Sequence, residues 1–330
     1  MPTLSLALLI AAAVASVSPA HASAWIVERL NLPGPVTELR QDGPAVYVKA
    51  GGWIRLEACD GGICRADATP PAISSAPDGI PHGAIATGTG NVTEAWYAEP
   101  TDRYGHGVLG DRIEGGALTV IAGGERLTHR LHDDHVFEDL TPRIVDLDGD
   151  GAEEVVTIRA NVREGAGLAV YGAAAGRLSE VAATPTIGRA NRWLNVAGIA
   201  DYSGDGSPDI AIVVTPHIGG RLEFWTLDDG GLERLDAARG FSNHAIGSTE
   251  LALSATVDID EDGVLDLVVP DAKRTILRFV AAKDGRILDL GQVPLGGRAA
   301  TAIGVIEQGD RPVFLLGLEN GVAVAVRASD

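Results

Sequence analysis

Three acidic stretches with the same internal spacing recur along this chain of 330 residues. They begin at Asp146, Asp201 and Asp258, so the steps between them are 55 and 57 residues. An apolar run leads into each stretch, and a run rich in β-branched residues follows it. A fixed period of about 50 residues is typical of repeat architectures. The repeat therefore constrains the fold more than any single element does.

Each repeat contains four short strand-like segments and almost no helical periodicity. After the first acidic stretch the segments read EVVTI, GLAVYG and RLSEVAA. Four short strands per unit are typical of one blade of a β-propeller. The same pattern without the acidic stretch covers residues 80–133 and, in shorter form, residues 35–72. The sequence therefore predicts an all-β propeller that forms a single domain over residues 23–330.

The last unit, from about Arg298, contains three strand-like segments and lacks a fourth. Residues 24–32 resemble the fourth strands of the other units. We expect them to complete the last blade, which closes the ring non-covalently and leaves no open sheet edge there. The count is then six blades of four antiparallel strands. It becomes seven if one of these units merges two blades.

Oxygen-bearing side chains occupy positions 1, 3, 5 and 9 of each acidic stretch, and glycine occupies position 6. The oxygen-bearing residues are Asp146, Asp148, Asp150 and Glu154, then Asp201, Ser203, Asp205 and Asp209, then Asp258, Asp260, Asp262 and Asp266. Each like-charge pair at contact distance costs about 1–4 kcal/mol at a surface-like dielectric, and a divalent cation removes that cost. An oxygen-only ligand set favours calcium over zinc or copper.

Backbone carbonyls at position 7 would complete each calcium shell, from Ala152, Ser207 and Val264. We therefore expect about three calcium ions with a structural role. The alternative is three solvated acidic turns that hold no metal. The stretches are not EF-hands, because position 12 is Thr157, Ile212 or Val269 instead of glutamate.

The pattern DxDxDGxxD/E between strands, on a propeller period, resembles the FG-GAP/VCBS repeat family. Integrin alpha-chain propellers are the best-known members of that family. The resemblance implies that each calcium loop joins the first and second strands of a blade on one face of the disc, and it does not imply a particular ligand. The Phe-Gly and Gly-Ala-Pro signatures are missing here, so the similarity to integrins is distant.

The loops that join strands two and three, and those between blades, should lie on the face opposite the calcium loops. Six of the eight histidines fall in these loops: His82, His106, His132, His135, His217 and His244. Such loops converge near the axis of a propeller, where ligands usually bind. The candidate ligand-binding residues are His106, Arg159, Arg189, Arg192, Trp193, His217, Asn243 and His244. Ordinary solvated loop polarity is the alternative interpretation.

Three functions are compatible with these features. The first is a binding module for a polar or anionic ligand, a glycan or a protein, without chemistry. The second is a hydrolase or lyase at the axial mouth, with His217 or His244 as general base or metal ligand. The third is a structural role in surface adhesion. The sequence contains no nucleophile elbow and no HExxH motif, so we favour binding.

The N-terminus predicts export. The apolar run LSLALLIAAAVASV precedes Ala20-His21-Ala22, an A-x-A-type cleavage site, so residues 1–22 are typical of a removable signal peptide. Lys and Arg are absent before the run, which departs from the usual pattern. Beyond it the sequence has no apolar span of 18 residues, and we expect no membrane span.

Cysteine spacing and charge agree with an exported protein. Cys59 and Cys64 flank Asp-Gly-Gly-Ile, and we expect them to form a disulfide across a hairpin in an oxidising compartment. Two free thiols are the alternative. The formal net charge of −19 argues against nucleic acid and anionic membranes as partners. We therefore expect a periplasmic or secreted protein.

Overall fold

The computed structural model describes residues 25–330 except 61, 229, 309–310 and 330. The predicted signal peptide, residues 1–22, lies outside the described residues. Nearly all regular structure is β-strand, because short apolar and β-branched runs alternate with turns. A single 3-10 turn at Lys283–Gly285 is the one helical element among the described residues. In that part of the chain, no helix is long and apolar enough to cross a membrane.

The strands pair antiparallel in groups of four that follow one another along the chain. The first group contains β2 (Glu38–Asp42), β3 (Ala45–Lys49), β4 (Trp53–Cys59) and β5 (Gly62–Asp67). The second contains β6 (Ala86–Thr87), β7 (Val92–Thr101), β8 (Glu114–Ala122) and β9 (Glu125–Arg130). The third contains β11 (Arg143–Val145), β12 (Glu154–Asn161), β13 (Gly165–Ala174) and β14 (Arg177–Ala183).

Three further groups complete the described chain. The fourth contains β15 (Leu194–Ala200), β16 (Asp209–Val214), β17 (Arg221–Asp228) and β18 (Gly231–Arg239). The fifth contains β19 (Ala255–Val257), β20 (Asp266–Pro270), β21 (Ile276–Ala281) and β22 (Leu288–Pro294). The sixth contains β23 (Gly304–Gln308), β24 (Arg311–Gly317), β25 (Ala323–Ala328) and the N-terminal β1 (Trp25–Arg29).

The N-terminal strand β1 completes the sixth group, which confirms the strand pairing predicted from the sequence. It pairs antiparallel with β25 from Trp25 opposite Ala328 to Arg29 opposite Val324. Its Trp25 ring also stacks on Phe279 of the fifth group, with ring centroids 4.0 Å apart. The N-terminal strand is therefore held by a sheet edge and by an aromatic contact to the neighbouring group.

A short strand, β10 (His135–Phe137), joins the second and third groups into one nine-stranded sheet. It pairs with β12 over its full length and with β8 through Phe137 and Gly115. This element is absent from the sequence-based prediction. Three residues are too short to show a periodic pattern, so only the tertiary contacts define this strand.

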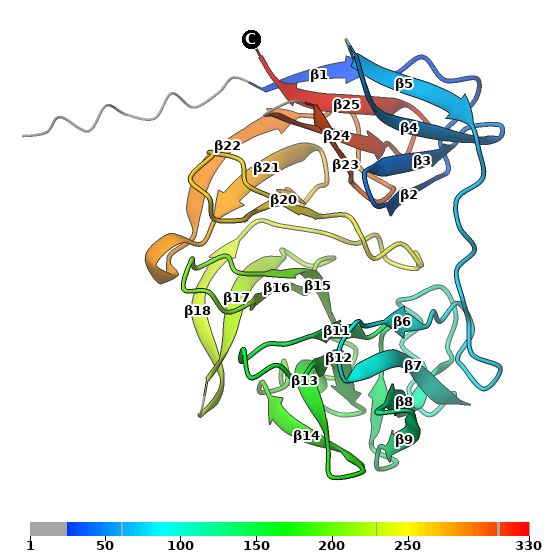
Figure 1. Ribbon diagram of the computed structural model, residues 1–330, viewed down its shortest axis with the longest axis vertical. Coiled ribbons are helices and arrows are strands. Elements are labelled where there is room, and N and C mark those ends of the chain that lie inside the picture. The colour runs from blue at the N-terminus through cyan, green and yellow to red at the C-terminus, as the bar shows by residue number, and fades with distance from the viewer. Residues whose placement is uncertain (1–24, 61, 229, 309–310, 330) are drawn as a thin grey trace, which may run out of the picture.

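Apolar clusters fill the spaces between most neighbouring groups. One cluster includes the second, third and fourth groups, and others join the fourth to the fifth, the fifth to the sixth, and the sixth to the first. Among the described residues, no such cluster joins the first group to the second. Figure 1 shows the segment from β5 to β6 running along that side of the molecule.

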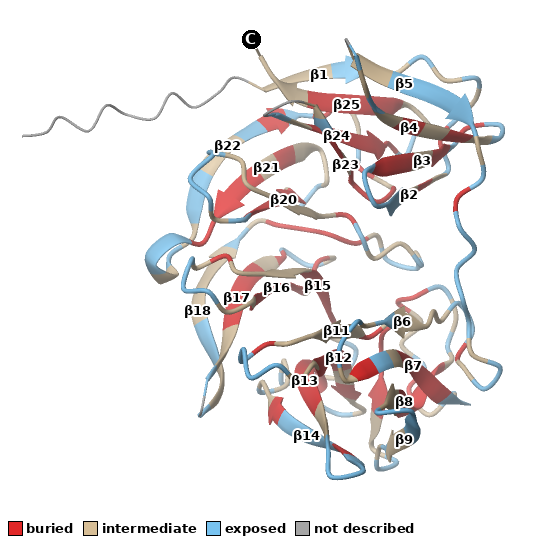
Figure 2. Ribbon diagram, viewed as in Figure 1, coloured by how far each residue is buried: buried red, intermediate tan, exposed pale blue. Residues whose placement is uncertain are grey.

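Burial follows strand position within each group. Figure 2 shows that middle strands such as β12, β16 and β24 are mostly buried, whereas the fourth strands β5 and β9 carry many exposed residues. This gradient places the continuous apolar strands in the interior and the polar fourth strands at the rim. An all-β, propeller-like fold is the result.

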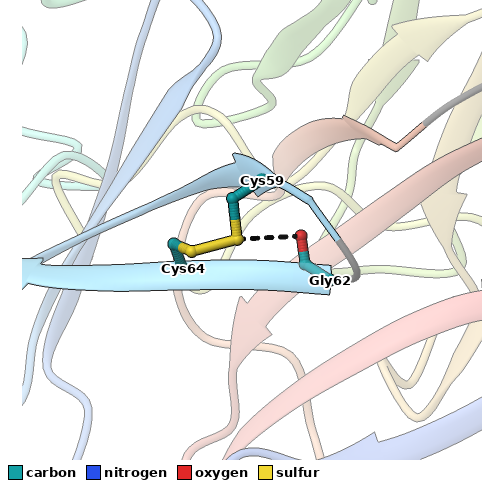
Figure 3. The surroundings of a disulfide bond; sticks show 3 residues. All are labelled: Cys59, Gly62 and Cys64. Atoms are coloured by element: carbon teal, nitrogen blue, oxygen red, sulfur yellow. Dashed lines mark hydrogen bonds between the residues drawn. A yellow bond between two sulfur atoms is a disulfide. The ribbon is translucent and has the colours of Figure 1, made fainter.

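The two cysteines form the expected disulfide at the end of the β4–β5 hairpin (Figure 3). Their Cα atoms are 5.7 Å apart, and Cys64 lies opposite Glu57 in the strand register. The Sγ atom of Cys59 lies 3.6 Å from the carbonyl oxygen of Gly62. The bridge therefore closes a turn that the strand pairing already brings together.

Candidate functional site

The three acidic stretches form turns at the same place in three successive groups. They connect β11 to β12, β15 to β16 and β19 to β20, which are the first and second strands of each group. The glycine at position 6 has a positive φ in each turn, 88° at Gly151, 96° at Gly206 and 88° at Gly263. Residues with a Cβ rarely adopt this conformation, so glycine permits the reversal.

The carboxylate at position 1 holds each turn in shape. Asp146 accepts hydrogen bonds from the backbone N–H groups of Gly149 and Gly151, at 2.8 and 3.0 Å. In the second turn Asp201 accepts from Gly204 and Gly206 at 2.7 and 2.9 Å. In the third turn the backbone N–H of Gly263, at position 6, donates to Asp258 at 2.9 Å. One local hydrogen-bond pattern thus defines all three turns.

The acid at position 9 is buried at the start of the second strand in every turn. Glu154, Asp209 and Asp266 each accept a backbone N–H from within their own turn, at 3.0, 2.8 and 2.8 Å. Burial, with added repulsion from the neighbouring carboxylates, raises the pKa of Glu154 and of Asp266 to about 7. Burial also raises the pKa of Asp209. Each turn therefore places a carboxylate where a cation would relieve its electrostatic cost.

Two of the turns gather three carboxylates closely enough to share an ion. The oxygens of Asp146, Asp148 and Glu154 lie within 4.8 Å of one another, and so do those of Asp258, Asp260 and Asp262. The second turn, with Ser203 at position 3, shows no such triple among the described residues.

Buried oxygens without hydrogen bonds also favour a cation. Ser203 Oγ, Asp209 Oδ1 and Asp258 Oδ1 are buried and have no hydrogen-bond partner in the described part of the chain. Unpaired buried oxygens are costly, and a hard divalent cation takes oxygen ligands of this kind. In the third turn Lys283 Nζ lies 2.6 Å from Asp262 Oδ2, so a cationic side chain already neutralises part of the negative charge of that turn. The donor set of all three turns fits calcium.

The opposite ends of the sheets bring three of the predicted histidines together with Trp193. His106 lies between β7 and β8, His217 between β16 and β17, and His244 between β18 and β19. The ring of Trp193 lies parallel to that of His217, with centroids 6.0 Å apart, and meets His244 edge-on at 4.7 Å. In antiparallel sheets these connections lie at the end away from the acidic turns. We call His106, Trp193, His217 and His244 the histidine face.

Hydrogen bonds determine the roles of the ring nitrogens in His244 and His217. His244 Nε2 lies 2.9 Å from the carbonyl oxygen of Ser248, so it carries the proton and donates. His244 Nδ1 is then the acceptor for His217 Nε2, which lies 2.7 Å away. His217 Nδ1 is left as the acceptor of the pair, without a hydrogen-bond partner among the described residues.

Burial keeps this histidine pair neutral. Loss of hydration lowers the pKa of His217 to about 4 and that of His244 to about 3. Burial, and then the charge of Arg192, lowers the pKa of His106 as well. Weakly basic rings are poor general bases at neutral pH. They act as neutral hydrogen-bonding groups, which suits binding better than proton transfer.

We predict that His217 and His244 do not titrate in the native protein between pH 8 and pH 5.5. Their native pKa values lie below the ordinary value of 6.5, so the unfolded chain takes up protons first. Their contribution to stability is therefore undiminished above about pH 6.5 and decreases as the pH falls toward 4. Two-dimensional NMR of the imidazole nitrogens measures this directly. Titration of both rings near 6.5 would contradict the buried arrangement.

The other predicted ligand-binding residues lie in different surroundings. Arg159 belongs to β12, lies opposite Phe137 of β10 and forms an ion pair with Glu180 of β14. Arg189 is exposed, and its backbone N–H donates to the carbonyl oxygen of Glu164 at 2.7 Å. Asn243 is buried and donates to the carbonyl oxygen of Val196 at 3.2 Å. These three residues therefore do not join the histidine face.

Two buried acids that the sequence pattern does not predict, Glu138 and Glu114, lie beside the histidine face. Glu138 Oε1 lies 2.6 Å from His106 Nδ1, while its Oε2 is buried without a hydrogen bond in the described residues. The carbonyl oxygen of Glu138 accepts the indole N–H of Trp193 at 2.8 Å. Burial raises the pKa of Glu138 well above its usual range and that of Glu114, also beside Glu138, to about 9. Acidic residues beside apolar runs, as in VFEDL, are the sequence signal for such groups.

The loop that carries His106 is packed against the body of the protein. Its Tyr104, Val108 and Leu109 are buried, and the carbonyl oxygen of Val108 accepts the N–H of Gly247 at 2.9 Å. This contact links it to the loop that carries His244. The histidine face is therefore held by loops from different groups.

Two exposed apolar side chains stand beside the histidines. Ile218 follows His217 and is 61% exposed, and Ile246 lies two residues after His244 and is 71% exposed. Each isoleucine therefore lies in the same loop as one of the two histidines.

A comparison with known protein families finds a repeat in the region of the acidic turns. The profile described as "FG-GAP-like repeat" matches residues 146–212, which include the first two acidic turns. Residues 146–212 therefore contain an FG-GAP-like repeat. Among solved structures, one similar chain is that of "BBS1N in complex with ARL6DN, soaked with mercury". It has 8% identity and a TM-score of 0.43, over 86% of this chain and 74% of that one. No curated protein matches the chain.

Proposed function

We propose that this protein is an exported, calcium-stabilised β-propeller that binds a ligand or a protein through the histidine face. The observation that carries the proposal is the convergence of His106, His217 and His244 at the ends of the sheets away from the acidic turns. Neutral rings, Arg192 and the exposed Ile218 together form a surface for a polar or anionic partner.

The proposed architecture is a ring of six blades. The six four-stranded groups of the described residues support that count over seven, and the pairing of β1 with β25 supports a last blade built from both ends of the chain. In this proposal the first and second blades are adjacent in the ring, and the segment of residues 68–79 connects them. Three calcium ions, one in each acidic turn, stabilise the third, fourth and fifth blades.

We also propose that the protein is periplasmic or secreted. The predicted signal peptide and the disulfide of Cys59 and Cys64 both favour the periplasm or the exterior of the cell. Millimolar calcium is available outside the cell, in the range where extracellular calcium modules bind.

A ligand screen on the calcium-loaded protein tests the function. The probes are inorganic phosphate, a hexuronic acid and a tripeptide with a free C-terminus, and thermal shift is the readout. We expect at least one probe to stabilise the protein, and the Arg192→Ala/His217→Asn variant to bind it at least 10-fold more weakly. Arg130→Ala, a matched change on the exposed strand β9, should not alter binding. Equal binding by all three proteins would refute the assignment of this face.

A further inference from the structure

A cavity lies between the fourth group and the segment of residues 184–187 that leads into it. Its volume is about 330 Å³, and its apolar lining includes Ile187, Leu194, Ile212 and Val214. Pockets for small molecules typically have volumes from about 300 Å³ upward. Its lining contains none of the three histidines of the histidine face. The cavity is therefore a separate candidate site.

One wall of the cavity is polar because of the strand register. Arg221, Glu223 and Trp225 alternate along β17 and so share one side of the sheet. Arg234 of β18 stands opposite Trp225, with its guanidinium 5.8 Å from the centre of the indole ring. All four side chains line the cavity. The register thus places two cations and one carboxylate beside an apolar floor.

The carboxylate of Glu223 is held by hydrogen bonds from other residues of this wall. Its side chain is 3% exposed and accepts hydrogen bonds from Arg221 Nε, from Trp225 Nε1 at 2.9 Å and from Arg234 at 3.4 Å. Within the described residues, Glu223 is the one carboxylate that contacts either arginine. Two guanidiniums thus meet one carboxylate at contact distance, and Asp236, whose pKa Arg234 also helps to lower, acts on Arg234 from farther away.

The two arginines keep donors for a second acceptor. A guanidinium has five N–H groups, and the contacts with Glu223 use Nε of Arg221 and one terminal nitrogen of Arg234. Arginine binds carboxylates with short, charge-assisted and often paired hydrogen bonds. Glu223 thus holds both guanidiniums in place and cannot neutralise both of them.

We propose that this cavity binds a small carboxylic acid with an apolar body. The carboxylate lies against Arg221 and Arg234, and the apolar body lies toward Ile187 and Val214. The free donors of the two guanidiniums select the anion, and the apolar floor selects against small, fully hydrated anions. This site is independent of the histidine face, so either site can fail its test without affecting the other.

NMR titration with sodium hexanoate tests the proposal, with hexanamide as the neutral probe of the same length. We expect hexanoate to shift the indole N–H resonance of Trp225, with a Kd of about 10 µM to 1 mM. Hexanamide should bind at least 10-fold more weakly. Arg234→Gln should weaken hexanoate binding about 10-fold. Arg130→Gln, which removes a surface arginine elsewhere, should leave the Kd unchanged.

Glu223→Gln is a second test variant, used in case Arg234→Gln fails to fold. It keeps the shape of the glutamate side chain. It removes the carboxylate that competes for the two guanidiniums, so we expect hexanoate to bind several-fold more tightly than to the wild type. The proposal is overturned if hexanoate leaves the Trp225 resonance unmoved at 20 mM, a concentration about 20 times the weakest expected Kd. Equal binding of hexanamide and hexanoate, or weaker hexanoate binding by Glu223→Gln, would overturn it as well.

Discussion

We expect removal of calcium to lower the melting temperature of this protein by about 10 °C. At ~1 mM calcium and a Kd of ~0.1 mM, each occupied turn adds about 1.4 kcal/mol. Three turns then contribute about 4 kcal/mol, and each kcal/mol shifts the melting temperature of a domain of this size by roughly 2–4 °C. Differential scanning calorimetry with calcium and with EDTA measures the shift. An identical melting temperature in both would exclude the calcium role.

The variant Glu154→Gln separates a metal site from an ordinary acidic turn. In EDTA the substitution should stabilise the protein, because it removes one of three carboxylates whose oxygens lie within 4.8 Å of one another. In calcium it should destabilise the protein, because it removes a charged ligand. The sign of the effect therefore reverses between the two conditions.

Asp133→Asn is the matched control for that experiment. Its side chain is 99% exposed and it lies outside the acidic turns, yet the change in charge is the same. Its effect should be small and equal in EDTA and in calcium. A Glu154→Gln variant that behaves like this control would show that the first turn binds no ion.

The acidic turns were predictable because local contacts define them. Asp146 and its hydrogen-bond donors Gly149 and Gly151 lie within six consecutive residues. Spacing along the chain therefore carries nearly all the information about the turn. The strand groups were predictable for a similar reason, since each strand pairs mainly with its neighbour in sequence.

Contacts between groups were much less predictable. Topology predicts His106, His217 and His244 on one face, and in the structure each lies in a connection at the end of its sheet away from the acidic turns. The sequence does not predict Glu138, which meets His106 across 32 residues of chain. Arg159, predicted in a loop, instead belongs to β12, which continues to Asn161. Such details depend on how the groups pack, and no local pattern records this packing.

Trp193 is the clearest case in which burial changes the interpretation of a candidate residue. Its sequence context predicts a ligand contact, but the residue is 2% exposed. Its indole N–H donates to the carbonyl oxygen of Glu138, and its ring packs on His217 and His244. The residue thus connects the segment after β10 to the loop between β16 and β17 and to the loop between β18 and β19. A packing role follows from these contacts.

Trp193→Ala should therefore destabilise the protein by about 3–5 kcal/mol, the usual cost of removing a large aromatic side chain from a core. Urea unfolding followed by circular dichroism measures the loss. Arg192→Ala changes the neighbouring residue, whose side chain is partly exposed, and should cost less than about 0.5 kcal/mol. If Trp193→Ala were as stable as Arg192→Ala, the indole ring would not be part of the core. In that case its place on the histidine face would be available to a ligand.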